Sequence, residues 1–233
     1  MKRLLLLIVL FLSLMAVKAQ PFESYVYRPA SLGYGALYNW YAASDANFAP
    51  SGYHVPTKIE WETLQTYLGG ESVAGIHLKE IGTTHWLTQS AGTDNSSGFG
   101  ARGGGYRIST GGYSQFRNVC GLMSSSLYSS YNYQPSLYYQ NADFLITNSY
   151  GEKKAGMSVR LIKDNSTNEG DLTDIDGNVY HVVDINGQIW TTSNFKCTTL
   201  NNGVPIVNVT DNTAWSLLVT GAYCYYGNDI GNK

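Results

Sequence analysis

The feature that most constrains this chain is a helix whose two ends are both written into the sequence at residues 57–68. Thr57 follows Pro56 and lies three residues before Glu60, which is the spacing of a capping box. In that motif the threonine hydroxyl accepts from the Glu60 N–H, and the carboxylate accepts from the Thr57 N–H. The apolar residues on one face of this helix are Trp61, Leu64 and Leu68. Gly69 and Gly70 then supply the left-handed residues that end a helix. The sequence therefore predicts an amphipathic helix, with Glu60 as a cap rather than a catalytic carboxylate.

Residues 1–19 have the pattern of a secretory signal peptide. A basic start precedes an apolar run from Leu4 to Val17, and small residues end at Ala19. No later segment approaches 18 consecutive apolar residues, the length a membrane helix needs. We therefore expect cleavage after Ala19 and export to the periplasm, the cell surface or the extracellular space, with no transmembrane segment after cleavage.

Composition limits the class of fold and of partner. The formal net charge of −2 gives no basic stripe, so no nucleic-acid partner is expected. Nineteen tyrosines and 25 glycines indicate short strands and many turns rather than a helical bundle. The cysteines at 120, 197 and 224 allow one disulfide and leave an odd thiol, and their spacing matches no zinc site.

Several further elements are expected before residue 165. Residues 33–43 read as a strand or short buried segment, and residues 158–163 read as a strand. A second short helix is expected over residues 72–80, with Val73 and Ile76 leaning inward and Ile81 just beyond. The run Gly103-Gly104-Gly105 lacks the strand and lysine context of a phosphate loop, so close backbone packing against aromatics is the expected role.

Residues 165–172 have the composition of a linker, and a hairpin follows it. Two apolar runs flank Asn186-Gly187, which is the residue pair preferred in type I′ turns. A short helix over residues 211–218, capped by Thr210 or Asp211, and a buried strand over residues 221–226 complete the chain.

Two acidic side chains precede the hairpin and raise the question of calcium. Asp174, Asp176 and Asn178 flank Gly177, but the further oxygen ligand and the glutamate of an EF-hand loop are missing. We expect a turn there, with calcium as the weaker alternative and no other cofactor.

Four segments carry a family resemblance that covers nearly all of the chain after residue 33. They are YGALYNWYA at residues 34–42, GYHVPTKIEW at 52–61, NSSGFGARGGGYR at 95–107 and SVRLIKD at 158–164. These resemble the Fibrobacter succinogenes major paralogous domain, a family of secreted proteins of Bacteroidetes and related bacteria. The resemblance implies an α+β, C-type-lectin-like fold with short antiparallel strands and two or three short helices, distantly similar to formylglycine-generating enzymes. Family cysteines are replaced here by Ala49 and Leu161, which fits the loss of one bridge.

The order of the segments differs from the family pattern. Residues 33–164 resemble the C-terminal half of the family domain, and residues 173–233 resemble its N-terminal half, after an irregular lead-in at 20–32. The resemblance therefore implies a circular permutation in which both segments complete one domain. A monomer closed on itself is favoured, and a domain-swapped oligomer is the alternative.

The stretch Ser124–Tyr150 is dominated by tyrosine, serine and asparagine, a composition found in antibody paratopes. Pro135 is expected to exclude a central strand there. The stretch also falls where C-type-lectin-like domains place their ligand-binding face. Candidate ligand-binding residues are Tyr128, Tyr131, Asn132, Tyr133, Tyr138, Tyr139, Asn141 and Asp143. For each tyrosine, packing within a loop-rich core is the alternative role.

Three classes of function are open at this point. The first is a secreted or cell-surface binding module for a carbohydrate or protein ligand. The second is an enzyme of formylglycine-generating descent, but that chemistry needs a cysteine pair, and only Cys120 lies before the end of its half. The histidines at 54, 77, 85 and 181 are scattered and are expected to be structural. The third is a structural or adhesive surface subunit. The sequence favours binding and names no catalytic or metal-ligating residue.

Overall fold

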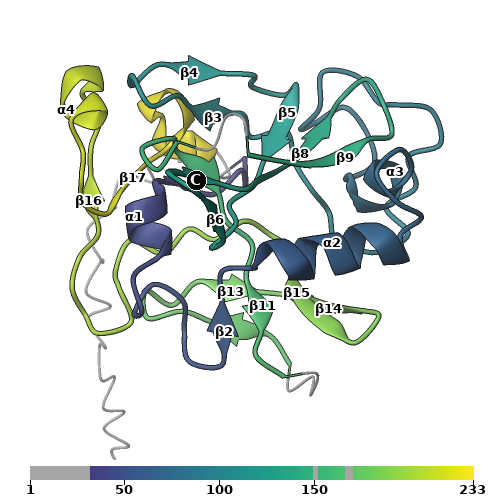
Figure 1. Cartoon of the computed structure of the whole chain (residues 1–233), viewed down its shortest axis with the longest axis horizontal. Coiled ribbons are helices and arrows are strands. Elements are labelled where there is room, and N and C mark those ends of the chain that lie inside the picture. Colours follow the sequence, from purple (N-terminus) through teal and green to yellow (C-terminus); the bar gives the residue numbers. More distant parts are fainter. Residues whose placement is uncertain (1–31, 149–151, 166–169) are drawn as a thin grey trace, which may run out of the picture.

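The computed structural model describes residues 32–148, 152–165 and 170–233. The predicted signal peptide, nearly all of the lead-in and the middle of the linker lie outside these residues. The described part is strand-rich with a few short helices, which confirms the α+β class (Figure 1). The helices are α1 (Trp40–Ala43), α2 (Lys58–Tyr67), α3 (Ala74–Leu78) and α4 (Asn212–Ser216), with 3₁₀ turns η1 (Tyr226–Asn228) and η2 (Ile230–Asn232). The strands are β1 (Leu37–Tyr38), β2 (Tyr53–His54), β3 (Tyr106–Arg107), β4 (Tyr113–Ser114), β5 (Val119–Gly121), β6 (Leu127–Tyr128), β7 (Tyr131–Asn132), β8 (Gln134–Tyr138), β9 (Phe144–Thr147), β10 (Met157–Ser158), β11 (Ile162–Lys163), β12 (Leu172–Thr173), β13 (Val179–Tyr180), β14 (Val182–Ile185), β15 (Gln188–Thr191), β16 (Val207–Asn208) and β17 (Ala222–Cys224).

The capped helix predicted over residues 57–68 is α2. Thr57 is its N-cap, and both bonds of the capping box form, with Glu60 Oε2 2.7 Å from the Thr57 nitrogen. Trp61 and Leu64 are buried, as the apolar spacing predicts. Gly69 follows with φ 99°, the left-handed conformation that ends the helix.

The second helix, α3, forms where it is predicted but buries a different face. Val73, expected to lean inward, is 38% exposed, and Ile76 is only partly buried. Ile81, just beyond the helix, is 61% exposed. The buried side consists of small residues and Leu78, because Gly75 packs directly on the backbone of residues 142 and 143. An ideal Cβ at Gly75 would lie 2.5 Å from the Ala142 carbonyl oxygen. The prediction was wrong because periodicity favours large apolar residues, whereas this contact requires the absence of a side chain.

Both four-stranded sheets combine strands from the two sequence segments. The first sheet has the order β10-β1-β17-β16, with Leu37 of β1 paired to Ser158 on one side and to Cys224 on the other. The second has the order β14-β15-β11-β2, and Ile162 of β11 pairs with both Trp190 and His54. Residues before and after the linker are therefore neighbours in both of these sheets.

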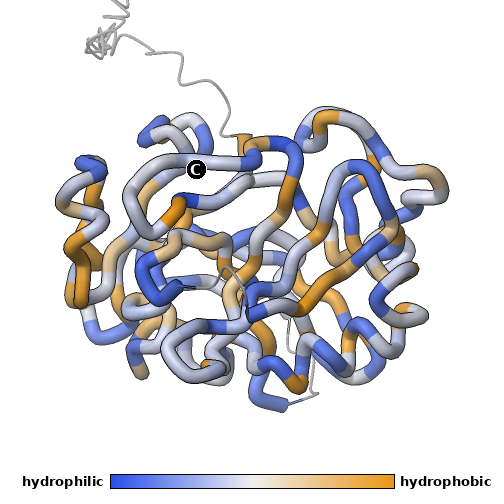
Figure 2. Tube along the Cα trace, turned by 45° about the horizontal axis from the view of Figure 1, so that its top comes forward, coloured by the Kyte–Doolittle hydropathy of each residue, from blue (hydrophilic) through white to orange (hydrophobic). Residues whose placement is uncertain are grey.

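The predicted hairpin is formed by β14 and β15. Asn186 and Gly187 have φ values of 55° and 80°, as a type I′ turn requires. The hairpin packs against α2, because the Trp190 ring lies 4.6 Å from the Trp61 ring, centroid to centroid. The ring of Phe144 in β9 also packs on Trp61, 5.9 Å away between centroids. Figure 1 shows α2 between β8 and β9 on one side and the β14–β15 hairpin on the other. Apolar stretches run through the middle of the molecule in Figure 2, and the two segments share this interior.

Two buried arginines also join the segments. Arg160 is 0% exposed and donates to the carbonyl oxygens of residues 99, 100 and 191 and to Asn194 Oδ1. Arg107 is equally buried, and its guanidinium carbon lies 4.2 Å from the Trp215 ring centroid of α4. It also donates to the carbonyl oxygens of residues 209–211. A planar fork with five donors suits this task of satisfying several carbonyls at once.

The first described residues lie beside the last ones. Leu32 N donates to Gly231 O at 2.9 Å, and Gly33 N donates to Lys233 O at 3.2 Å. This places residues 32–33 and 231–233 within hydrogen-bonding distance of one another.

A three-stranded sheet with the order β5-β8-β9 contains Pro135 in its central strand, so the prediction that proline excludes one was wrong. The Pro135 carbonyl accepts from Leu122 N at 2.8 Å, and the ladder with β5 begins one residue later, at Ser136. The missing proline N–H therefore lies opposite Leu122, just where the paired ladder with β5 ends, while β9 continues the pairing on the other side.

The cysteines are all free and buried. Burial raises the pKa of Cys120 to about 11 and that of Cys197 to about 12, and it also raises the pKa of Cys224. These thiols are protonated at neutral pH and act as small core residues.

Candidate ligand-binding site

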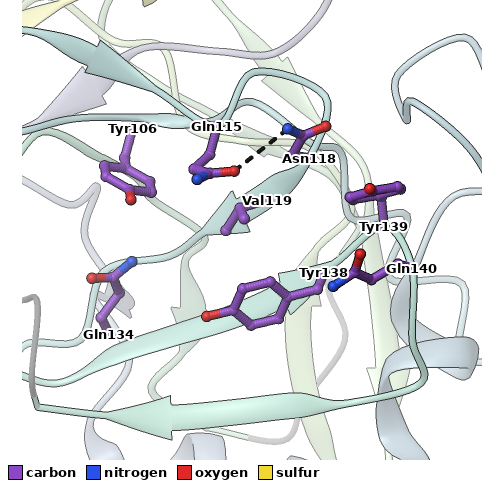
Figure 3. Close-up of a pocket in the computed structure, with 8 residues that line it drawn as sticks. All are labelled: Tyr106, Gln115, Asn118, Val119, Gln134, Tyr138, Tyr139 and Gln140. Atoms are coloured by element: carbon purple, nitrogen blue, oxygen red, sulfur yellow. Dashed lines mark hydrogen bonds between the residues drawn. The ribbon is translucent and has the colours of Figure 1, made fainter.

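A pocket of about 560 Å³ opens beside strands β3, β5 and β8 (Figure 3). This volume lies within the range of small-molecule sites in proteins. Its lining residues are mostly tyrosines and side-chain amides: Tyr106, Gln115, Asn118, Val119, Gln134, Tyr138, Tyr139 and Gln140.

Strand alternation sets the floor of the pocket. Gln134 and Tyr138 are four residues apart in β8, so they point to the same face of the sheet. Val119 of β5 is paired directly with Tyr138 and adds an apolar surface between them. Tyr106 of β3 faces this floor from the other side (Figure 3). Gly121 leaves space between Gln134 and Tyr106 at one end of the pocket, because a Cβ at this position would lie 3.2 Å from Gln134 Nε2 and 3.6 Å from Tyr106 Cδ1.

Gln134 is the most unusual group in the pocket. Its side chain is 3% exposed, and its Oε1 has no hydrogen-bond partner among the described residues. A buried acceptor left without a donor costs about 1–3 kcal/mol. Because the Oε1 atom is itself buried, a ligand donor reaches it only when the amide turns toward the pocket, and that hydrogen bond would then remove the cost.

The lining carries no Asp, Glu, Lys, Arg or His, so the pocket offers hydrogen bonds and aromatic faces without formal charge. Gln115 Oε1 accepts from Asn118 Nδ2 at 3.5 Å, which leaves further donor and acceptor sites on both amides. The arrangement suits a neutral ligand with several hydroxyl or amide groups.

The structure divides the eight predicted ligand-binding residues into separate groups. Tyr138 and Tyr139 line the pocket. Asn141 and Asp143 lie in the turn that follows, which we call the rim turn (residues 139–143), and Asn141 Nδ2 donates to Asp143 Oδ2 at 2.7 Å.

The second group lies on the β6–β7 hairpin and beside it. Tyr128 and Tyr131 face each other across the tight turn and are 58% and 42% exposed. Tyr133 is half-buried, and its ring lies 6.3 Å from that of Tyr128 and 5.3 Å from the Lys58 ammonium. Asn132 is 1% exposed, and its amide points inward to Met123 Sδ at 3.2 Å. Only the tyrosines of this group are offered to solvent.

Six lining residues lie outside the predicted set: Tyr106, Gln115, Asn118, Val119, Gln134 and Gln140. Their signal in the sequence is weak, because four of them precede the Tyr/Ser/Asn-rich stretch and are brought to it by the pairing of β5 with β8. Gln134 lies inside the stretch but was not selected, since glutamine is not part of the paratope composition used.

The histidines are paired with carboxylates rather than grouped together. His54 Nδ1 lies 2.6 Å from Asp164 Oδ1, and its Nε2 lies 2.8 Å from Glu60 Oε1. The Glu60 hydrogen bond is the main cause that raises the pKa of His54. His77, His85 and His181 contact Asp94, Glu80 and Asp171. Within residues 32–148, 152–165 and 170–233, no three His, Cys, Asp or Glu side chains come together as a metal site.

The acidic turn before the hairpin is internally bonded. Asp174 Oδ1 accepts from Asn178 N at 2.9 Å, and its Oδ2 accepts from the Tyr180 hydroxyl at 2.6 Å. Asp176 Oδ2 accepts from Thr198 N at 2.6 Å. These bonds form the expected turn around Gly177, whose φ is 81°.

In the described ranges, none of the helices has both the length and the apolar character needed to span a bilayer.

Comparisons with curated proteins and with solved structures give no significant match. The model of one protein family, described as the Fibrobacter succinogenes major domain, matches residues 20–163, which is more than half of the chain. The chain belongs to the Fibrobacter succinogenes major domain family.

Proposed function

We propose that this protein is an exported binding module that holds a neutral carbohydrate in the pocket between Tyr106, Gln134 and Tyr138. The observation that carries the proposal is the buried Gln134 acceptor without a partner, set among tyrosines and amides. Residues 1–19, with the pattern of a signal peptide, supply the expectation of export.

The chemistry of the lining fits sugars in two ways. Tyrosine rings give flat apolar faces with low side-chain entropy, which suit the C–H faces of sugar rings. Side-chain amides supply both donors and acceptors, which suit hydroxyl groups that are themselves both. The absence of charge in the lining favours a neutral sugar over a uronic acid or a phosphorylated one.

The same lining argues for binding rather than catalysis. Its titratable side chains are the tyrosines Tyr106, Tyr138 and Tyr139, whereas hydrolysis of a glycosidic bond ordinarily uses a pair of carboxylates. The thiol chemistry of formylglycine-generating enzymes finds no support either, since the three cysteines are buried with raised pKa values.

A second candidate function is adhesion to a surface protein. The exposed tyrosines Tyr128 and Tyr131, with Leu127 at 38% exposure, favour it because aromatic residues dominate protein interfaces. In this alternative the hairpin, rather than the pocket, makes the contact.

We also infer a C-type-lectin-like fold in circularly permuted order, closed within one chain. The support is the shared core of the two segments and the hydrogen bonds between residues 32–33 and 231–233. Joining ends that already touch would restore the family order without moving any element. A monomer follows from this closure, and light scattering distinguishes it from a swapped dimer.

The test uses the mature chain from residue 20 and isothermal titration with cellotetraose, xylotetraose, mannotetraose and fully acetylated chitotetraose. We expect a Kd of about 1 mM or tighter for at least one of them. Tetragalacturonate, which carries charge, is expected not to bind. No binding to any neutral tetrasaccharide would refute the proposal.

Matched variants separate the pocket from the hairpin. Gln134→Leu keeps the size of the side chain but removes the acceptor, and we expect about fivefold to tenfold weaker binding. Tyr131→Ala is the control on the exposed hairpin and is expected to leave sugar affinity unchanged. The reverse result, with binding lost only in Tyr131→Ala, would favour the adhesive alternative, which an array of surface proteins then tests.

A further inference from the structure

Lys79 is a buried lysine that the proposed function has not used. It lies at the C-cap of α3 and is 2% exposed. Lysine is seldom buried to this extent unless its ammonium is paired or hydrogen-bonded. Its position behind the pocket makes it a candidate for a specific role.

All three donors of the ammonium are used. Lys79 Nζ donates to the Tyr138 carbonyl oxygen at 2.9 Å, to the Asn141 carbonyl oxygen at 2.6 Å and to Ser90 Oγ. The Trp86 ring lies beside it, with 5.8 Å from Nζ to the ring centroid. Tyr138 directly precedes the rim turn and Asn141 lies within it. The ammonium therefore joins the start of the turn to its middle, on either side of Tyr139 and Gln140, which line the pocket.

The rim turn has few other anchors. Tyr139 N donates to Asn118 O at 2.9 Å, and Gly75 N donates to Ala142 O at 2.8 Å. Hydrogen bonds from a charged donor are roughly twice as strong as neutral ones. The ammonium is therefore a strong part of what holds this turn against α3.

We propose that Lys79 is a positioning residue for the ligand pocket, whose ammonium fixes the rim turn from behind so that Tyr139 and Gln140 meet the ligand. This inference rests on the proposed function for the nature of the ligand. The positioning itself is a property of the free protein and is measurable without one.

The protonation of Lys79 provides a readout that a purely structural lysine would lack. Burial lowers the pKa of Lys79 to about 8, with the carboxylate of Asp143 on the rim turn acting in the opposite direction. Above that pH the neutral amine keeps only two donors and loses charge assistance, so ligand affinity falls. The free energy of unfolding rises with pH over the same range, because between pH 8 and 10.5 the Lys79 side chain binds a proton in the unfolded chain but not in the folded one. Weaker binding above pH 8 would then not reflect unfolding.

The experiment compares Lys79→Met with Lys154→Met in the full mature chain. Lys154 is a matched control because its Nζ also donates to a carbonyl, that of Ser216, but next to α4. Hydrogen exchange without ligand is expected to be about tenfold faster at the amides of Tyr139 and Gly75 in Lys79→Met, and unchanged there in Lys154→Met. Equal exchange in all three proteins, or acceleration spread evenly over the core, would overturn the inference.

Affinity for the four tetrasaccharides provides the second readout. Lys79→Met is expected to weaken binding about tenfold, and the wild-type protein to lose affinity above pH 8. Binding that is intact in Lys79→Met would overturn the inference and leave the proposed function standing. Wild-type protein that binds no sugar would refute the proposed function, while the exchange data still decide the positioning role.

If Lys79→Met does not fold, Ser90→Ala takes its place. That variant removes one of the three acceptors and keeps the ammonium. We expect a smaller acceleration of exchange at the same two amides, and no change there would overturn the inference.

Discussion

The contact between α3 and the rim turn predicts that Gly75→Ala destabilises the protein, whereas the same change in an unpacked helix would stabilise it. In an unpacked helix, replacing glycine by alanine stabilises the protein by about 1 kcal/mol. Here a Cβ would lie 2.5 Å from the Ala142 carbonyl oxygen and 2.6 Å from that of Asp143. The backbone must move apart, which strains the Gly75–Ala142 hydrogen bond of 2.8 Å. Overpacking costs about 1–3 kcal/mol, and the lost bond about 1 kcal/mol more.

The net expectation for Gly75→Ala is a loss of about 2 kcal/mol in the free energy of unfolding. For a domain of this size, that lowers the melting temperature by roughly 4–8 °C. Urea denaturation and thermal unfolding followed by circular dichroism measure both quantities. Gly112→Ala is the control, because the nearest atom to its Cβ would be Ile108 Cδ1 at 3.4 Å, and the change should stay within about 0.5 kcal/mol. A Gly75→Ala protein more stable than wild type would refute the packing of α3 on the rim turn.

Three further predictions concern the links between the two segments and the ion pairs of His54 within the first of them. Arg160→Met leaves four acceptors without their donor, and we expect urea denaturation to show a loss of at least about 3 kcal/mol; a loss below 1 kcal/mol would contradict the role given to Arg160. The pKa of His54 is raised in the folded protein, so its ion pairs stabilise the fold fully below the unfolded-state pKa of 6.5 and lose this effect as pH rises through the folded pKa. His54→Gln should therefore lower the free energy of unfolding more at pH 5.5 than at pH 8.5, by up to about 1 kcal/mol. An equal cost at both pH values would exclude the ion pair. A chain with residue 233 joined to residue 32 by a short glycine linker and opened within 166–169 should fold to a monomer with a similar circular dichroism spectrum, and an insoluble or unfolded product would count against closure within one chain.

The elements that the sequence predicts best are those whose signals are local. The capping box at Thr57 and the Asn186-Gly187 turn depend on residues within a few positions of one another, and both form as expected. The inward positions of α3 and the strand through Pro135 were predicted wrongly. In each case the outcome depends on a remote backbone, namely the rim turn for Gly75 and the end of β5 for Pro135.

The pocket is harder to predict for the same reason. Composition selected Tyr138 and Tyr139, which do line it. Tyr106 lies in β3, and Gln115 and Asn118 lie between β4 and β5. They reach the pocket because β5 pairs with β8, Val119 opposite Tyr138, and no spacing in the sequence predicts that register. That the Gln134 Oε1 atom has no hydrogen-bond partner depends on which groups pack around it in the folded protein, and the sequence does not give this.

The most direct test of the central claim follows the Gln134 side-chain amide by NMR while the neutral tetrasaccharides are added. We expect the Gln134 Nε2–H₂ resonances and the Val119 backbone amide to shift together and to saturate with the Kd measured by titration calorimetry. The amides of Ser129 and Ser130 on the hairpin should not shift. Shifts confined to the hairpin, with the Gln134 resonances unmoved at saturating sugar, would contradict the claim.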